Sequence, residues 1–261
     1  MNNSERYDFA RSLVAEAGTL AHNHFNNRDR LNITSKGLQD MASQADLETE
    51  LLIRHRIAEA FPQDAFLGEE TGATALSPGQ GIWVVDPIDG TQPFISGLTA
   101  WCISIAYVVD SEVQFGLVFA PARDELFCGG IGIPATLNGK IIVGNRAKSL
   151  ADGIVAVGFS PRLGANTFVP LFAAILAAGG VFYREGSGAL ALCYVAAGRL
   201  NGFIEQHINS WDCLGAIAVL QAAGLQTSDF LADDGLIKGG HLIAGNASVY
   251  GQLDKIYRNQ T

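Results

Sequence analysis

The sequence predicts an α+β fold, with an antiparallel sheet in the first half of the chain and an α/β arrangement in the second. Two segments of helical periodicity come first, then short apolar strands between turn residues, then alternating strands and helices. The links between the middle strands are too short for parallel crossovers, which favours antiparallel pairing. The later alternation is typical of an α/β layer packed on a first one. We therefore expect two halves, residues 1–145 and 146–261.

Two helices are expected near the start of the chain. Ser4 can cap the first, which extends to about residue 27. A polar loop over 32–44 leads to the second, expected over 46–61. The apolar side chains that we expect on the inward face of this second helix are Leu47, Leu51, Ile57, Ala58 and Phe61. The charged side chains that we expect on its remaining surface are Glu48, Glu50, Arg54, Arg56 and Glu59.

Turn residues delimit the elements that follow. The strands expected in the first half are 65–68, 82–85, 102–109, 113–119 and 125–129, with a short strand within 134–146. The strands expected in the second half are 154–158, 181–184, 200–205 and 241–244, and the helices are 165–178, 188–197, 211–223 and one after Asn246.

The composition describes a folded protein with a large core. Of its 261 residues, 48% are hydrophobic and 16% charged. The formal net charge of −9 disfavours a broad nucleic-acid or anionic-membrane surface, so we expect neither partner. The longest apolar stretch, 168–183, is too short to span a membrane. The four cysteines form no CxxC pair and the chain begins without a signal pattern, so we expect buried thiols and a cytoplasmic protein.

The run from Trp83 to Thr91 is the most informative part of the sequence. An apolar strand ends in Asp86, Asp89 follows three residues later, and Gly90 and Thr91 can begin a helix. Carboxylate oxygens suit Mg²⁺, which retains waters that a phosphate can replace. N–H groups at a helix start can bind the phosphate itself. Because Asp-Pro-x-Asp-Gly is also typical of a surface turn, the interpretation depends on the residues that accompany it.

Four further acidic residues stand where they can complete a metal site. Glu69 follows a short strand, Asp212 begins an apolar helix, Asp46 begins another helix, and Glu205 ends a strand. Each also has a simpler explanation, as a loop residue, a helix cap or a rim residue. Strand ends and helix starts are where open α/β sites gather ligands from distant parts of a sequence. Together these residues are typical of a metal cluster.

With these residues in place, the sequence resembles the inositol monophosphatase family of Mg²⁺-dependent, lithium-sensitive phosphatases over nearly its whole length. The motifs that carry the resemblance by order and spacing are Lys36 with 40–46, Gly68-Glu69-Glu70, 83–91, Gly186-Ser187-Gly188-Ala189-Leu190, 193–199 and Trp211-Asp212. The resemblance implies a layered α-β-α-β-α sandwich. In it, the first half holds most metal-binding motifs and the second half completes the site. A homodimer is also implied.

The resemblance further implies a site for two or three Mg²⁺ ions. The residues that would bind one ion are Glu69, Asp86 and Ile88 through its carbonyl, and those that would bind a second are Asp86, Asp89 and Asp212. Two divalent ions can clamp the attacking and leaving oxygens of an in-line displacement. They also offset the charge on the phosphoryl oxygens, so no His or Cys nucleophile is required.

Roles for the remaining residues follow from the same resemblance. Thr91 paired with Asp46 would orient and activate the attacking water, and Glu69 is counted with them as catalytic. The N–H groups of Gly90 and Thr91 would hold the phosphate. The residues expected near the substrate are Glu205, Gly188 and Lys36.

Departures from the family pattern are confined to the surroundings of the leaving group. They are Gln92-Pro93 after Thr91, Gly188, Ala191 and Asn209. Proline is tolerated in the first turn of a helix, so the phosphate site can survive. What changes is the set of donors beside it, and this bears on the identity of the substrate.

The function that we expect is therefore a Mg²⁺-dependent phosphomonoesterase acting on a small polyol phosphate, most simply inositol 1-phosphate. Histidinol-phosphate phosphatase is the strongest alternative on the same scaffold, and fructose-bisphosphatase stays open. Bisphosphate nucleotidase is disfavoured, because the basic residue and Glu expected before Phe94 are missing. An alternative from another class is a regulatory protein that binds a protein partner.

Overall fold

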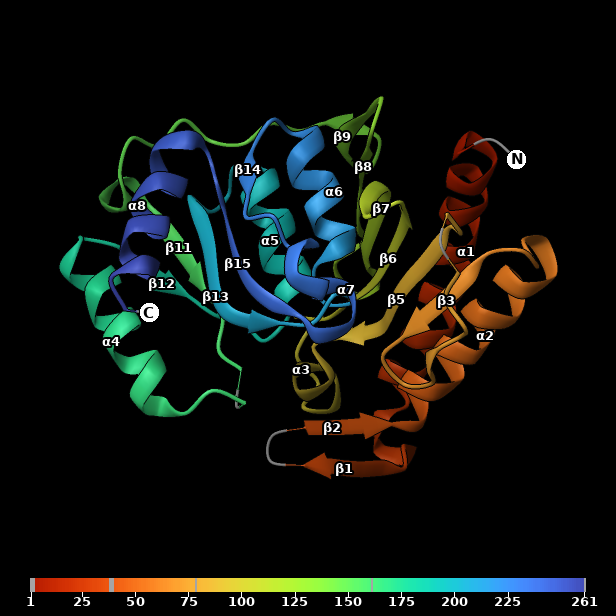
Figure 1. Ribbon diagram of the computed structural model, residues 1–261. Coiled ribbons are helices and arrows are strands. Elements are labelled where there is room, and N and C mark those ends of the chain that lie inside the picture. Colours follow the sequence, from red (N-terminus) through yellow and green to blue (C-terminus); the bar gives the residue numbers. More distant parts are fainter. Residues whose placement is uncertain (1–2, 38–39, 78, 161, 261) are drawn as a thin grey trace.

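Sheets and helices alternate in layers through the molecule, as the computed structural model of the chain shows (Figure 1). It describes residues 3–37, 40–77, 79–160 and 162–260, apart from the side chains of 35–42. The helices α1 (Asn3–Asn26) and α2 (Gln44–Ala60) cover the outer face of a larger sheet. The helices α5 (Gly188–Ala196) and α6 (Leu214–Ala222) lie between that sheet and a smaller one. The helices α4 (Ala165–Ala177) and α8 (Ala247–Arg258) form the last layer, so the α-β-α-β-α order is confirmed.

The larger sheet is mostly antiparallel, as its short links predict. Its strands in spatial order are β10 (Lys140–Ile141), β9 (Ile133–Leu137), β8 (Glu125–Gly130), β7 (Glu112–Ala120), β6 (Cys102–Val109), β5 (Ile82–Asp89), β3 (Ala65–Gly68) and β4 (Gly72–Ala73). The exception is the parallel pair of β3 and β5. Strand β4 reverses the chain along the outside of β3, so the return to β5 needs no helical crossover.

The smaller sheet is mixed. Its strands in spatial order are β12 (Val181–Tyr183), β11 (Ile154–Val157), β13 (Gly202–Ile208), β15 (Gly240–Gly245) and β14 (Gln226–Thr227). Strand β11 runs parallel to both of its neighbours, whereas β15 is antiparallel to β13 and β14. The expected α/β alternation is therefore present, with a parallel edge and an antiparallel edge.

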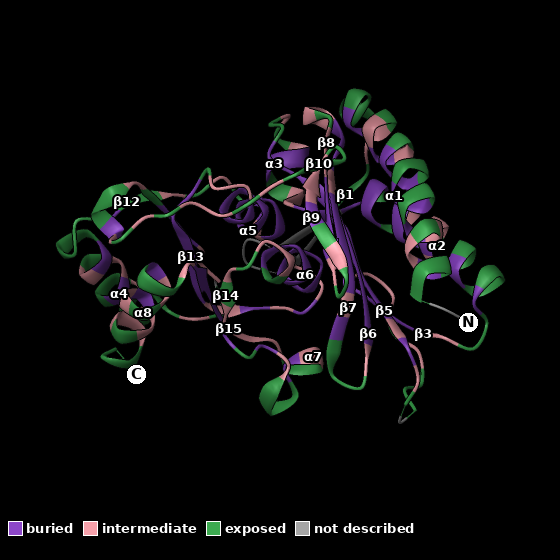
Figure 2. Cartoon of the chain, turned by 90° about the horizontal axis from the view of Figure 1, so that it is seen from above, coloured by how far each residue is buried: buried purple, intermediate pink, exposed green. Residues whose placement is uncertain are grey.

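The central helices α5 and α6 are buried on nearly all sides (Figure 2). Their sequences are apolar throughout, and a helix of that kind must be covered on every face. Small residues allow this close packing: a Cβ on Gly116 of β7 would lie 2.1 Å from the carbonyl oxygen of Gly215 in α6. The four cysteines are free and buried, as expected.

Helix α2 presents a different face to the core from the one that its leucines predict. Leu47 and Leu51 are 45% and 48% exposed, whereas Glu50 is fully buried. Asp46 and Thr49 lie on the same buried face. The predicted inward face is wrong because it assigned burial by hydrophobicity alone, while this face meets polar groups of the neighbouring turns. Ala58 is also exposed, and Ile57 and Phe61 are buried as expected.

Four further segments differ from the prediction. The stretch expected as a polar loop contains the paired strands β1 (Ile33–Gly37) and β2 (Asp40–Ser43). Helix α6 begins at Leu214, after Asp212, because the carboxylate of Asp212 bonds back to the N–H of Asn209 and holds a turn there. The short helix α3 (Thr91–Ile95) was expected only as a helix start at Gly90 and Thr91, without an end. The short helix α7 (Gly235–Lys238) was not expected. Among the described residues, none of the helices is both long enough and apolar enough for a membrane span.

Candidate active site

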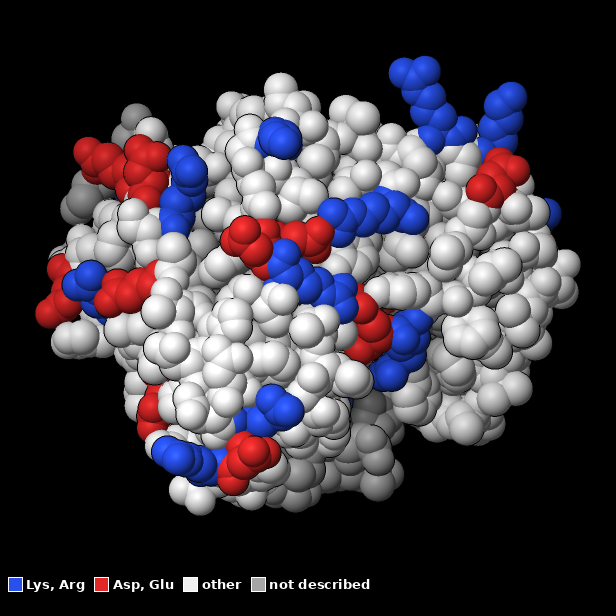
Figure 3. All heavy atoms as spheres, turned by 180° about the vertical axis from the view of Figure 1, so that it is seen from behind, with Lys and Arg blue, Asp and Glu red and all other residues white. Residues whose placement is uncertain are grey.

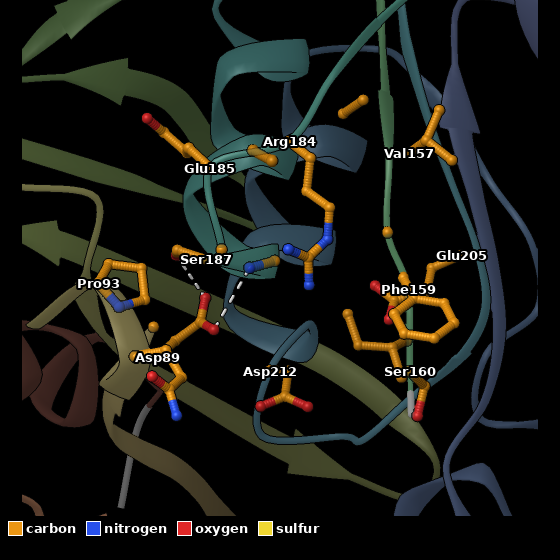
Figure 4. Close-up of a pocket in the computed structure, with 18 of the residues that line it drawn as sticks. Asp89, Pro93, Val157, Phe159, Ser160, Arg184, Glu185, Ser187, Glu205 and Asp212 are labelled. Carbon is orange, nitrogen blue, oxygen red and sulfur yellow. Dashed lines mark hydrogen bonds between the residues drawn. The ribbon is translucent and has the colours of Figure 1, made fainter. Parts of the chain in front are cut away.

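A cavity of about 730 Å³ opens between the two sheets. Its floor is formed where β5 ends and α3 begins, and its opposite wall by β13 and the turn before α6. Glu69, Asp89 and Asp212 line it from three separate segments, and Glu205 lines it from β13. Figure 4 shows Asp89, Asp212 and Glu205 around this cavity. The structure thus brings together carboxylates that the sequence places far apart.

Three of these carboxylates form a compact cluster. One oxygen from each of Glu69, Asp86 and Asp212 lies within 4.8 Å of the others. Asp86 is 1% exposed, and its Oδ1 accepts a hydrogen bond of 2.9 Å from the N–H of Ile88. Its Oδ2 is buried and finds no hydrogen-bond donor among the described residues. Burial, followed by the charges of Glu69, Asp89 and Asp212, raises the pKa of Asp86 well above its ordinary value.

Asp89 connects the two halves of the chain. Its Oδ2 accepts hydrogen bonds from Ser187 Oγ at 2.6 Å and from the N–H of Ala189 at 2.7 Å, and its Oδ1 accepts one of 3.3 Å from the N–H of Gly188. These groups form the first turn of α5, where a negative charge is stabilised. Burial, then the charge of Asp212, nevertheless raises the pKa of Asp89 to about 7. Such a carboxylate gains from a cation placed beside it.

Thr91 and Asp46 are paired as expected. Thr91 Oγ1 donates to Asp46 Oδ1 at 3.0 Å and lies 3.3 Å from the carbonyl oxygen of Ile88. The other oxygen of Asp46 accepts from Ser43, from its N–H at 2.9 Å and from its hydroxyl at 2.6 Å, which forms a capping box at the start of α2. Burial raises the pKa of Asp46, and its bonds with Ser43 and Thr91 oppose that rise.

Glu205 stands on the opposite wall. It is 9% exposed, and a Cβ on Gly158 of the neighbouring segment would lie 2.0 Å from its Oε2, so only glycine leaves room for this carboxylate. No hydrogen-bond donor to Glu205 is found within the described part of the chain. Burial, then the charge of Asp212, raises its pKa to about 8, and Arg184 acts in the opposite direction. Figure 4 shows Arg184 extending into the same cavity.

The remaining predicted residues are placed as follows. Gly90 lies between β5 and α3 with a φ of 96°, and its Cβ position would meet the carbonyl oxygen of Ala100 at 2.6 Å, so a side chain is excluded there. Gly188 lines the cavity. Lys36 belongs to β1, and its side chain lies outside the described residues.

Some residues of the cavity were missed by the sequence reasoning. They are Phe159, Arg162, Tyr183, Arg184, Glu185 and the side chain of Ser187. Only Ser187 stood in a recognised motif, and its position just before α5 was the available signal. Asn209 was noted in the sequence only as a departure near the leaving group. In the structure, its N–H and Nδ2 both donate to Asp212 Oδ2, at 3.1 and 3.0 Å.

The donor set fits a hard divalent cation. Carboxylate oxygens, with the carbonyl of Ile88 nearby, are the ligands that Mg²⁺ prefers. The buried, undonated Oδ2 of Asp86 among like charges is the observation that supports this fit. Without a cation, this crowding of carboxylates is electrostatically unfavourable.

Comparisons with known proteins agree with the fold and with the family resemblance seen in the sequence. The model of the inositol monophosphatase family matches residues 2–258. Nus factor SuhB of Haemophilus influenzae is 32% identical over 241 residues, which cover 91% of this chain and 90% of the relative. Inositol-1-monophosphatase of Mesorhizobium japonicum is 34% identical over 245 residues, with coverages of 92% and 91%. The crystal structure of extragenic suppressor protein suhB from Bartonella henselae has a TM-score of 0.89 at 29% identity, covering 96% of this chain and 97% of that one.

The layered fold and the carboxylate cluster define a class, that of phosphatase-type α+β proteins with a cavity whose carboxylates could hold a metal ion. The chain belongs to the inositol monophosphatase family, and the resemblance seen in the sequence is confirmed. Its relatives bear two kinds of name, one for a phosphatase and one for a Nus factor. Because some relatives are named Nus factor, the expectation that the protein has no nucleic-acid partner is not supported. On the face seen in Figure 3, basic and acidic side chains lie interspersed.

Proposed function

We propose that the protein is a Mg²⁺-dependent phosphomonoesterase that hydrolyses a small polyol phosphate, most simply inositol 1-phosphate. The carboxylate cluster of Glu69, Asp86 and Asp212 at the cavity carries the proposal. Two or three Mg²⁺ ions would be held there, with Asp89 and the Ile88 carbonyl completing the ligands. When bound, these ions would lower the pKa of water and neutralise charge on the phosphoryl oxygens.

The residues of the chain have separate tasks in this mechanism. Thr91 Oγ1 donates a hydrogen bond to Asp46 Oδ1, so its lone pairs are left to accept a hydrogen bond from the attacking water. Asp46 holds the hydroxyl in that orientation and is the group to which the proton of the water can pass through Thr91. The N–H groups of Gly90 and Thr91 would bind the phosphate. Glu69, a member of the cluster, would orient the water through its second oxygen.

The leaving group would lie against Glu205, Arg184 and Gly188. A buried carboxylate without a donor can accept hydrogen bonds from the hydroxyl groups of a polyol. Lys36 would approach from the β1–β2 hairpin. Lithium sensitivity and a homodimeric state are part of the same proposal.

A second candidate substrate is histidinol phosphate. Glu205 is the observation that favours it, because a buried carboxylate with a raised pKa also suits an ammonium group. A regulatory function is a further candidate, favoured by the relatives named Nus factor SuhB. It would use the protein surface and need not exclude catalysis.

The test is a panel assay of phosphate release from inositol 1-phosphate, histidinol phosphate, fructose 1,6-bisphosphate and adenosine 3′,5′-bisphosphate. Each substrate is assayed with and without Mg²⁺ and Li⁺. We expect Mg²⁺-dependent turnover of inositol 1-phosphate that Li⁺ inhibits. If histidinol phosphate were turned over faster, it would replace inositol 1-phosphate as the proposed substrate. If no substrate were turned over, the regulatory function would be favoured.

A further inference from the structure

Glu50 is a buried carboxylate that has no role in the mechanism above. It projects from α2 and is fully buried. Its Oε2 accepts a hydrogen bond of 2.8 Å from the N–H of Glu70, and its Oε1 accepts one of 2.7 Å from the N–H of Thr71. A buried carboxylate is costly unless such donors are present. Both donors belong to the turn that directly follows Glu69.

The chain leaves space for this carboxylate. A Cβ on Gly68 would lie 2.5 Å from the Cδ and Oε2 atoms of Glu50. Gly68 is the residue just before Glu69, and it pairs with Gly72 across the tight β3–β4 hairpin. Glu50 therefore touches the hairpin on both sides of Glu69, at the glycine before it and at the two N–H groups after it.

Helix α2 reaches the site through one face. Asp46, Glu50 and Arg54 are spaced four residues apart, which places them one above the other on a helix. Asp46 binds Thr91, Glu50 binds the hairpin backbone, and Arg54 donates to the hydroxyl of Thr71 at 2.6 Å. One rigid helix thus holds both the hydroxyl proposed to orient the water and the turn that carries Glu69.

We infer that Glu50 is a positioning residue that fixes Glu69 for metal binding by holding the hairpin backbone around it. The inference rests on the proposed Mg²⁺ site, in which Glu69 is a ligand. Residues that orient metal ligands without touching the metal typically change metal affinity by 10- to 100-fold. Glu50 differs from an ordinary core residue because both of its oxygens are committed to the two peptide groups next to a ligand.

The experiment measures Mg²⁺ binding to the whole protein by isothermal titration calorimetry, without substrate. In Glu50→Gln, the amide NH₂ would face one of the two N–H donors, so the hairpin must shift. We expect the dissociation constant for Mg²⁺ to rise about 10-fold or more, while circular dichroism stays that of the wild type. Activity should return toward the wild-type kcat at saturating Mg²⁺, which a defect of folding alone would not produce.

The matched control is Glu48→Gln, since Glu48 lies on the same helix but binds His24, away from the cluster. It should bind Mg²⁺ as the wild type does. Gly68→Ala is a second variant, because its methyl group would push the Glu50 carboxylate away from the hairpin. It should weaken Mg²⁺ binding in the same way, and it decides the question if Glu50→Gln does not fold.

The outcomes separate this inference from the proposed function. Wild-type affinity in a folded Glu50→Gln protein, or in Gly68→Ala if the first does not fold, overturns the positioning role alone. A wild-type protein that binds no Mg²⁺ overturns the metal site and with it the positioning role. Mg²⁺ binding that weakens in the variants of a protein without phosphatase activity would support the positioning role and contradict the proposed function.

Discussion

Two buried glutamates, Glu50 behind the hairpin of Glu69 and Glu205 at the cavity, differ in the hydrogen bonds that their carboxylates receive. Glu50, beside the hairpin that carries Glu69, packs against Gly68 and receives two backbone hydrogen bonds. Glu205, on the other wall, packs against Gly158 and receives none from the described residues. A satisfied buried carboxylate stabilises the protein around it, whereas an unsatisfied one gains when a ligand supplies the partner. We call the side of the cavity with Glu69, Asp86, Asp89 and Asp212 the metal wall, after its proposed role. The difference supports the proposal that the metal wall is built in advance and that the wall of Glu205 would be completed by a substrate.

The largest effect is expected from a substitution of Asp86, at the centre of the metal wall. Asp86→Asn preserves the shape of the side chain but removes the charge that would bind both Mg²⁺ ions. We expect Mg²⁺-dependent phosphate release to fall by about 10³-fold, the upper range for removing one electrostatic contact to a transition state. Steady-state assays at several Mg²⁺ concentrations measure this. Asp8→Asn on the exposed side of α1 is the control, and turnover unchanged in Asp86→Asn would show that the metal assignment is wrong.

The next effect concerns the orientation of the attacking water. Thr91→Val keeps the volume of the side chain but removes the hydroxyl that binds Asp46. We expect kcat to fall by about 10²-fold, since positioned proton transfer contributes about 10²–10⁴-fold. Mg²⁺ affinity should change little. Thr91→Ser restores the hydroxyl and should recover most of the rate; an equal loss in both variants would argue against this role.

The placement of Asp86 and Asp89 was predictable from the sequence, and the polar face of α2 was not. Asp86 and Asp89 follow the apolar run 82–85, so their placement in the last part of a sheet strand could be derived from pattern alone. Glu50 was assigned to the surface because charged residues are rarely buried. Only the hairpin after β3, which is distant in sequence, supplies its donors. The sequence alone does not display such a partner.

The same limit applies to the wall of Glu205. Its strand and its acidic end were expected, but the glycine that makes room for it comes from a different strand segment. Arg184 and Phe159 reach the cavity from connecting segments, where hydrophobic periodicity carries no information. Recognition of the family predicted which carboxylates gather at the cavity, whereas several residues around the proposed leaving group come from connecting segments that carry no such pattern.

A pH measurement sharpens the comparison between the two glutamates. The pKa of Glu205 is raised to about 8 in the folded protein, so the unfolded state loses this proton first as the pH rises. Wild-type stability should therefore fall between the ordinary pKa and about pH 8. Glu205→Gln removes this loss. In metal-free protein, its free energy of unfolding relative to wild type should increase by about 2 kcal/mol between about pH 5.5 and 7.5.

Urea denaturation of both proteins at each pH measures this difference. The control is Glu112→Gln, an exposed residue of β7, which should show no comparable change. A difference between Glu205→Gln and wild type that stays constant with pH would mean that the Glu205 carboxylate is already ionised and paired. The two walls would then not differ in the way described.

The smallest expected effect lies where the two halves meet. Ser187→Ala removes the 2.6 Å hydrogen bond to Asp89 and the N-cap of α5, in which Ser187 accepts from the N–H of Leu190. Loss of a cap and of one bond to a carboxylate costs about 1–2 kcal/mol. Because Ala189 and Gly188 still donate to Asp89, Mg²⁺ binding should weaken only a few-fold, far less than in Asp86→Asn. Thermal unfolding and Mg²⁺ titration of Ser187→Ala and Ser187→Thr test this, with threonine expected to retain both bonds. If Ser187→Ala abolished Mg²⁺ binding altogether, the metal wall would depend on the second half of the chain much more than its backbone bonds indicate.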